Sequence, residues 1–145
     1  MMQSTGNSTC GGSKVIVKLR NKICALVVDD NTVSRKLLMT MLSWAKIKAQ
    51  EVENGKEAID LFASGANFHV IFIDMDMPIM DGPETTRILR SMGVNSRIVG
   101  VSAQSKASDK AMFIGAGLNE FHEKPLSRTK LVEILHHVDA DIGIN

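Results

Sequence analysis

The sequence predicts an α/β fold: a doubly wound, five-stranded parallel sheet with helices on both faces. Short apolar runs alternate along the chain with longer segments whose apolar residues recur at helical spacing. The runs at 23–28 and 70–73 are apolar at every position, as strands buried on both faces are. Regular strand–helix alternation indicates parallel strands joined by right-handed crossovers.

The expected strands follow from the apolar runs and the turn residues around them. They span about residues 23–28, 48–52, 69–73, 97–101 and 119–122. The second of these is the poorest in apolar residues, which predicts an edge position. Cys24 lies in the first strand and is expected to be a small buried hydrophobe.

The expected helices follow from apolar periodicity and from punctuation by Gly, Pro and Ser. They span about residues 32–46, 56–64, 83–92, 105–115 and 128–138. Pro83 suits the first turn of the third helix, Ser127 can cap the fifth, and Gly65 closes the second. The first helix should bury one face, made of Val33, Leu37, Leu38, Met41, Leu42 and Ala45.

Polar residues follow four of the apolar runs at once. They are Asp29-Asp30, Asp74, Ser102 and Lys124. Because open α/β sheets place their sites at the carboxyl ends of the strands, these groups are expected to meet at one spot. Close carboxylates repel each other, by roughly 4 kcal/mol per pair at an effective dielectric near 20. A hard cation such as Mg2+ relieves this repulsion and can bridge to a phosphoryl group, toward which an aspartate is a plausible nucleophile.

Five short motifs carry a family resemblance. In order, they are Asp29-Asp30, Asp74 with Met77-Pro78, Asp81-Gly82, Ser102-Ala103 and Lys124-Pro125. Together they resemble the signature of the response-regulator receiver domain, over about residues 22–139. The resemblance implies the flavodoxin-like receiver fold and a Mg2+-dependent transfer of a phosphoryl group from a histidine to Asp74.

The resemblance also assigns roles to individual residues. Asp74, Ser102 and Lys124 match the catalytic positions, and Asp29, Asp30, Asp74 and the backbone carbonyl of Asp76 match the metal site. Asp30 matches the direct ligand and Asp29 the acid that helps through water.

Ser102 and Phe121 match the switch pair, although Phe lacks the phenol of a tyrosine. Pro125 matches a cis-proline that fixes the loop of Lys124. Asp76 and Gln104 border the approach of water to the phosphorus, so they are expected to tune phosphate lifetime.

Each assignment has a plainer alternative. The two adjacent aspartates could form a strand-end turn or a helix N-cap, Ser102 could cap a helix, and Lys124 could lie on the surface. Asp81 is expected to be a turn or cap residue. The histidines, His69, His122, His136 and His137, show no metal-ligand spacing and are expected to be core or surface residues.

The motifs at 117–119 and 123–126 resemble eukaryotic phosphorelay receivers, and short stand-alone plant type-C response regulators resemble the chain best in size. The implied partner is a histidine-containing phosphotransfer protein, in a plant phosphorelay of which cytokinin signalling is the expected setting. The implied activity is single-turnover self-phosphorylation with autodephosphorylation, rather than conventional enzyme turnover. Two alternatives are a receiver excised from a hybrid histidine kinase or transcription factor, and a haloacid-dehalogenase-like phosphatase. The phosphatase would place its nucleophile on the first strand.

Composition indicates one domain in a chain of 145 residues. We expect a flexible leader at 1–21, the receiver at 22–139 and a tail at 140–145. Two cysteines make no disulfide framework, and neither a signal peptide nor a membrane span is expected. The expected protein is a monomer in the cytoplasm, with the nucleus as a second compartment, that binds neither nucleic acid nor membrane.

The net charge of +1 conceals an asymmetry along the chain. Residues 1–22 contain four basic residues and no acid, which leaves 13 basic against 16 acidic residues in the remainder. This basic segment could contact nucleic acid or an acidic partner. The Ser-, Thr-, Gly- and Asn-rich composition of residues 1–13 favours the alternative, a solvated disordered leader.

Overall fold

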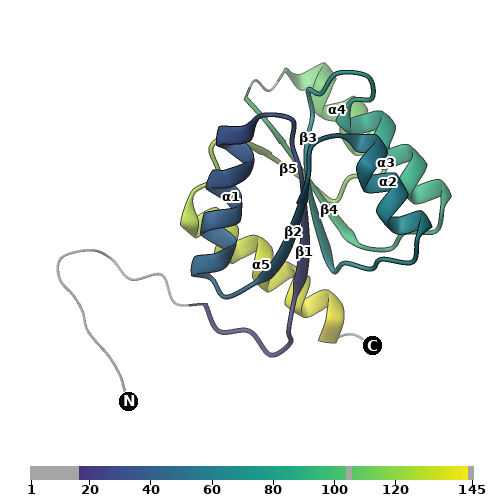
Figure 1. Ribbon diagram of the computed structural model, residues 1–145. Helices are drawn as coiled ribbons and strands as arrows, with labels where there is room; N and C mark the ends of the chain where they lie inside the picture. The colour runs from purple at the N-terminus through teal and green to yellow at the C-terminus, as the bar shows by residue number, and fades with distance from the viewer. Residues whose placement is uncertain (1–16, 104–105, 144–145) are drawn as a thin grey trace, which may run out of the picture.

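The computed structural model describes residues 17–103 and 106–143 and confirms the doubly wound parallel sheet (Figure 1). The strand order is β2-β1-β3-β4-β5, so β2 lies at one edge, as its polar sequence predicts. All four strand pairs are parallel. The strands are β1 (Cys24–Val28), β2 (Lys48–Val52), β3 (Val70–Asp74), β4 (Arg97–Ser102) and β5 (Glu120–Glu123).

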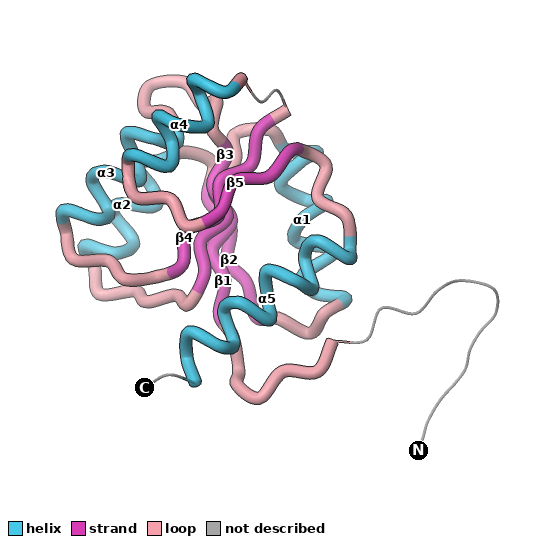
Figure 2. Tube along the Cα trace, turned by 180° about the vertical axis from the view of Figure 1, so that it is seen from behind, coloured by secondary structure: helices cyan, strands magenta, loops and turns pink. Residues whose placement is uncertain are grey.

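The helices cover both faces of the sheet. They are α1 (Thr32–Trp44), α2 (Gly55–Ala63), α3 (Gly82–Ser91), α4 (Ala107–Gly115) and α5 (Arg128–Gly143). Helices α1 and α5 lie on one face, and α2, α3 and α4 on the other (Figure 2). None of the helices in the described part of the chain has the length and apolarity needed to span a bilayer.

Two apolar cores follow from the period-two alternation of the strands. Val27 and Phe72 point toward α1 and α5, whereas Val28 and Ile73 point toward α2, α3 and α4. All four side chains are almost completely buried. Helices therefore cover both faces of the sheet, and the strand ends are where its residues can reach solvent or a ligand.

The helix limits follow local capping. Asn54 accepts a hydrogen bond from the backbone N–H of Glu57, and Asp81 accepts one from that of Glu84. Ser127 accepts one from Lys130, which confirms its expected capping role, and Pro83 lies in the first turn of α3 as expected.

Three sequence-based expectations need correction. Helix α5 continues to Gly143 instead of ending near 138, because its apolar face continues through Ile142, which packs against the core. Cys24 is partly exposed, since β1 begins at this residue near the surface. Val33 and Leu37 do not join the buried face of α1: their exposed fractions are 79% and 49%.

The last part of the expected leader packs on the domain. Val17 and Leu19 pack against the core cluster to which α1 and α5 contribute. The carboxylate of Asp139 accepts hydrogen bonds from the backbone N–H groups of Arg20 and Asn21, at 2.8 and 3.0 Å. Residues 17–21 thus lie on the folded domain, whereas the expectation for residues 1–13 falls outside the described residues. The domain limits themselves stay a prediction.

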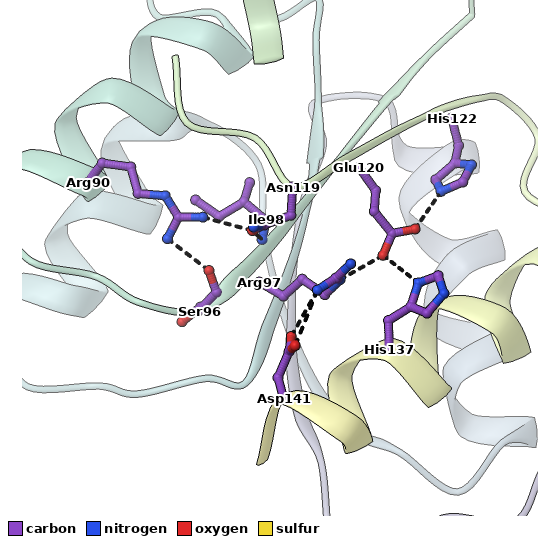
Figure 3. A network of polar contacts seen from close by, with 9 residues as sticks. All are labelled: Arg90, Ser96, Arg97, Ile98, Asn119, Glu120, His122, His137 and Asp141. Carbon is purple, nitrogen blue, oxygen red and sulfur yellow. Dashed lines mark hydrogen bonds and ion pairs between the residues drawn. The ribbon is translucent and has the colours of Figure 1, made fainter. Parts of the chain in front are cut away.

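A polar network joins β4, β5 and α5 near the amino ends of these strands (Figure 3). Arg97 bonds to Glu120 at 2.6 Å, and the rings of His122 and His137 lie 3.0 and 2.9 Å from the same carboxylate. Burial would raise the pKa of Glu120, but these hydrogen bonds, led by that from Arg97, outweigh burial and hold the pKa at about 2. Glu120 thereby ties the edge strand β5 to α5.

Candidate functional site

The polar strand ends converge at the carboxyl edge of the sheet, as expected. Asp29 and Asp30 follow β1, and Asp74 ends β3; one carboxylate oxygen from each lies within 4.8 Å of the other two. Lys124, which follows β5, reaches across to Asp29 at 2.9 Å and to Asp74 at 3.1 Å. Residues far apart in sequence thus form one acidic pocket with one ammonium.

The pocket holds excess negative charge. Asp29 and Asp74 are buried, at 4% and 5% exposure, whereas Asp30 is exposed. Burial, reinforced by the neighbouring charge of Asp29, raises the pKa of Asp74 from 3.8 to about 6, against the opposing effect of Lys124. Burial alone would lower the pKa of Lys124, but hydrogen bonding to Asp29 and the charge of Asp74 raise it overall. One ammonium is not enough to neutralise three carboxylates.

The loop that carries Asp29 is fixed by backbone contacts. Asp29 Oδ1 accepts a hydrogen bond from the N–H of Asn31, and Asn31 in turn caps α1. Neither aspartate of the pair is the helix cap, so the plainer capping alternative does not hold.

Sequence reasoning missed Arg35, which supports this loop from behind. Its guanidinium is buried and donates to the carbonyl oxygen of Asp29 at 2.8 Å and to Glu51 of β2 at 2.8 Å. Glu51 also binds Lys36. The sequence does contain a sign of this role. Arg35 lies three residues before Leu38, so it falls on the buried face of α1, where an arginine needs a partner.

Ser102 is fully buried at the end of β4, and Lys124 donates its backbone N–H to the Ser102 carbonyl oxygen at 2.8 Å. The Lys124–Pro125 peptide bond is cis, as the resemblance implies. Phe121 is partly buried and packs edge-to-face on Phe113 of α4, with ring centroids 6.0 Å apart. The expected switch pair therefore lies on adjacent strands, β4 and β5.

The segment after β3 turns back against Asp74. Gly82 donates its N–H to the Met75 carbonyl oxygen, and a Cβ on Gly82 would lie 2.5 Å from the Asp74 carbonyl oxygen. Only glycine fits this approach, which explains the Asp81-Gly82 motif. Asp76 is exposed within the same segment, whereas Gln104 lies outside the described residues.

The histidines take structural positions. His69 Nδ1 accepts a hydrogen bond from the backbone N–H of Cys24, and His122 and His137 contact Glu120. Among the residues described by the structure, the aspartate triad is the only cluster of three or more potential metal ligands.

Fold and site together define a response-regulator receiver domain, and the chain belongs to that family: the model named "Response regulator receiver domain" matches residues 25–136. The three carboxylates form an acidic triad typical of a receiver Mg2+ site. The haloacid-dehalogenase alternative is set aside, since Asp74 ends the third strand rather than the first.

Among known proteins, the chain is similar to stand-alone plant response regulators. Two-component response regulator 24 of Arabidopsis thaliana is 46% identical over 119 residues, which cover 82% of this chain and 86% of that protein. Two-component response regulator ARR22 of the same plant is 36% identical over 138 residues, covering 94% and 96%. The resemblance to stand-alone plant regulators is thereby confirmed.

Two solved structures are similar in fold and bear on the site. The receiver domain of the histidine kinase PA1611 of Pseudomonas aeruginosa, with magnesium coordinated in its active-site cleft, matches with a TM-score of 0.73 and 25% identity, covering 83% of this chain and 99% of that one. The Saccharomyces cerevisiae co-crystal of the phosphotransfer protein Ypd1 and the receiver domain of Ssk1 matches with a TM-score of 0.75 and 25% identity, covering 88% and 92%.

Proposed function

We propose that Asp74 of this chain accepts a phosphoryl group from a histidine-containing phosphotransfer protein, in a Mg2+-dependent reaction. The observation that carries the proposal is the pocket itself. Three carboxylates lie within 4.8 Å of one another, and Lys124 contacts the buried Asp74 at 3.1 Å. A buried carboxylate of this kind is a plausible nucleophile, and the ammonium is placed to receive phosphoryl oxygens.

The donor set fits a magnesium ion. All three side chains offer hard oxygen ligands, and the raised pKa of Asp74 marks negative charge that Lys124 does not balance. Asp30 is the exposed member and is proposed as a direct ligand. Asp29, already bonded to Asn31 and Lys124, is proposed to act through water, and the Asp76 carbonyl is proposed as a further ligand. Bound Mg2+ would neutralise charge on the phosphoryl oxygens.

In the proposed step an Asp74 carboxylate oxygen attacks the phosphorus of phosphohistidine. An O–P bond forms, the P–N bond breaks, and the electron pair of that bond returns to the imidazole. Lys124 shifts its contact from the Asp74 carboxylate to a phosphoryl oxygen, and the Ser102 hydroxyl donates to another. Ser102 and Phe121 are then proposed to move together as the switch.

The proposed partner docks beside the pocket, against α1. A groove of about 420 Å3 there has a mainly apolar lining, which includes the exposed Val33 and Leu37 of α1 and the Pro125-Leu126 turn. Asp29 and Lys124 lie in the same groove, so a helix seated in it would hold its histidine near Asp74. The Ypd1–Ssk1 co-crystal supports this class of partner.

Phosphate loss by hydrolysis is proposed as the second activity, with Asp76 and Gln104 bordering the path of water. The expected link to cytokinin signalling rests on the family resemblance alone and stays a prediction. A receiver excised from a larger kinase or transcription factor would carry out the same phosphotransfer.

The decisive experiment mixes the chain with a phosphotransfer protein labelled on its histidine, with Mg2+ present, and follows the label on both proteins. Label should move to this chain, and Asp74→Asn, which keeps side-chain size but loses the nucleophile, should remain unlabelled while folded. Excess chelator should stop transfer to the wild-type chain. Labelling of Asp74→Asn at the wild-type rate would place the acceptor elsewhere and overturn the proposal.

A further inference from the structure

A second charged surface lies at the opposite end of the sheet from the aspartates. Lys22 precedes β1, Lys46 lies in the turn from α1 to β2, and Lys48 is the first residue of β2. The register pairs Cys24 with Lys48, so the two strands bring these segments side by side. Lys18, on the packed segment 17–21, adds a fourth exposed ammonium.

These ammonium groups are not neutralised within the domain. Among the described residues, none of Lys18, Lys22, Lys46 and Lys48 lies within 4.0 Å of a carboxylate, in contrast to Lys36, Lys56 and Lys124. The sequence holds no acid before Asp29 and none between residues 44 and 50. Asp139, which contacts the segment that carries Lys18 and Lys22, accepts hydrogen bonds from the backbone of Arg20 and Asn21 rather than from a lysine.

The backbone at Lys46 adopts a conformation that is unfavourable for most residues other than glycine. Lys46 has a φ of 60°, the left-handed conformation in which glycine or asparagine is favoured over a residue with a long side chain. Lys46 directly follows Ala45, the C-cap of α1, a position where helices commonly end in this conformation. Here the conformation places a lysine, rather than a glycine, at the rim of a groove.

The groove between these lysines has an apolar floor. Its volume is about 570 Å3, and Val17, Leu19, Ile23, Ala45 and Ile47 line it together with Lys22, Lys46 and Lys48. The floor side chains are buried or partly buried, so they lie recessed behind the ammonium groups. The site therefore combines recessed apolar surface with a cationic rim.

We infer that this groove, which we call the basic groove, binds an acidic peptide segment of a partner protein. Carboxylates of such a segment would pair with the rim lysines, and an interspersed apolar side chain would enter the floor. The chain's own residues 1–16 are poor candidates, since they contain Lys14 and no acid.

Two other polyanions fit the basic groove less well. Single-stranded nucleic acid is held by bases stacked on aromatic rings, and none of the described residues that line the groove is aromatic. An anionic membrane would favour apolar side chains that protrude into the lipid, whereas here they are recessed. An acidic peptide with apolar side chains fits both the lysine rim and the recessed apolar floor.

The test measures fluorescence anisotropy of a labelled peptide of Glu-Glu-Leu repeats with the full chain. We expect saturable binding that weakens as salt rises. The charge-reversal pair Lys46→Glu with Lys48→Glu should weaken binding by at least about tenfold. The matched control is Lys106→Glu at the N-cap of α4 with Lys110→Glu on α4, which makes the same charge change at exposed lysines elsewhere and should bind as wild type. Thermal melts establish that both pairs fold.

Two further measurements test the apolar floor of the groove and its independence from the aspartate pocket. A peptide with Ser in place of Leu should bind more weakly, and Asp74→Asn should bind as wild type, because the basic groove is independent of the proposed phosphotransfer. The inference is overturned if the Glu-Glu-Leu peptide does not bind, or if the α4 pair weakens binding equally. Tighter binding of a single-stranded oligonucleotide or of phosphatidylserine vesicles through Lys46 and Lys48 would also overturn it.

Discussion

Asp74 illustrates how tertiary surroundings change one side chain. Its pKa of about 6 lies above the usual 3.8 because it is buried beside another carboxylate. Between these two values the folded state holds a proton that the unfolded state has lost, so this group's contribution to stability falls as the pH rises from about 4 to 6. Above this window the folded chain keeps an uncompensated carboxylate, which a cation would stabilise.

The first prediction concerns competition between protons and Mg2+ at Asp74. Since the metal needs the carboxylate form, Mg2+ affinity should be constant above about pH 7 and fall steadily as the pH drops below about 6. Titration calorimetry or NMR across this range measures the effect. The fall should be much weaker in Asp74→Asn, which has no proton to displace; an equally steep fall in that variant would assign the titration to another group.

A second prediction concerns phosphate lifetime. Hydrolysis requires a water in line with the phosphorus, opposite the Asp74 oxygen. Asp76 is exposed in the adjoining segment, and Gln104 can both donate to and accept from water. Replacing either by leucine should slow phosphate loss several-fold, roughly 1 kcal/mol of barrier, without blocking phosphorylation. Decay of labelled protein measures this, and unchanged decay in both variants would leave lifetime control to other residues.

At the scale of elements, the acid loop depends on a contact between α1 and the edge strand β2. Arg35 of α1 joins Glu51 of β2 to the backbone of Asp29. Arg35→Lys keeps the positive charge, but a lysine does not contact both Glu51 and the Asp29 carbonyl oxygen as the guanidinium does. We predict that this change weakens Mg2+ binding by several-fold, up to about tenfold. Calorimetric titration of folded protein measures the affinity.

The control for that prediction is Arg90→Lys. Arg90 is partly buried and, like Arg35, donates to backbone carbonyl oxygens, here those of Val94, Ser96 and Gly117 at the opposite end of the sheet from the aspartates. Both variants should lose stability in urea unfolding, but only Arg35→Lys should lose Mg2+ affinity. Equal Mg2+ affinity in Arg35→Lys and wild type would reduce Arg35 to a purely structural role.

Helix α1 supports a further prediction about docking. Val33→Asp adds a charge to the apolar groove beside Asp74, so transfer from a phosphotransfer protein should slow by at least about tenfold. Labelling by phosphoramidate, a small donor that needs no docking, should be unchanged. Met112→Asp, a similar change on the exposed face of α4, is the matched control. Equal slowing with both donors would place the defect in the pocket instead.

At the scale of the whole molecule, the Glu120 network joins the edge strand β5 to β4 and to helix α5. The depressed pKa of Glu120 contributes stability that is complete above about pH 4.5 and is lost as the pH falls toward about 2. Glu120→Gln should therefore lower the free energy of unfolding at pH 7 by about 1 to 3 kcal/mol. The loss should shrink at low pH.

Urea unfolding across pH 2 to 7 measures this prediction, because the range covers the interval between the pKa values of about 2 and 4.5 in which the contribution is lost. The exposed Glu53→Gln is the control and should leave the curve unchanged. A Glu120→Gln loss that does not depend on pH would assign its effect to packing rather than to charge.

Much of the fold and of the candidate site could be predicted from the sequence because both have local signatures. Buried apolar runs set the strands, and Asn, Asp and Ser caps with Gly and Pro set most helix limits. Parallel alternation brings every carboxyl end to one edge, so a polar residue after each run is sufficient to bring Asp74 and Lys124 together. The sequence could not predict which apolar residues of α1 stay exposed.

Only the tertiary structure decided the features that need a neighbour from elsewhere in the chain. Burial and the neighbouring charge of Asp29 raise the pKa of Asp74. Arg35 is recognised as part of the site only because its guanidinium donates to the carbonyl oxygen of Asp29. The basic groove requires the register that places Lys48 beside β1, with residues 17–22 packed across the core. Spacing along a chain predicts periodic burial, whereas charge and desolvation depend on distances that only the packed fold sets.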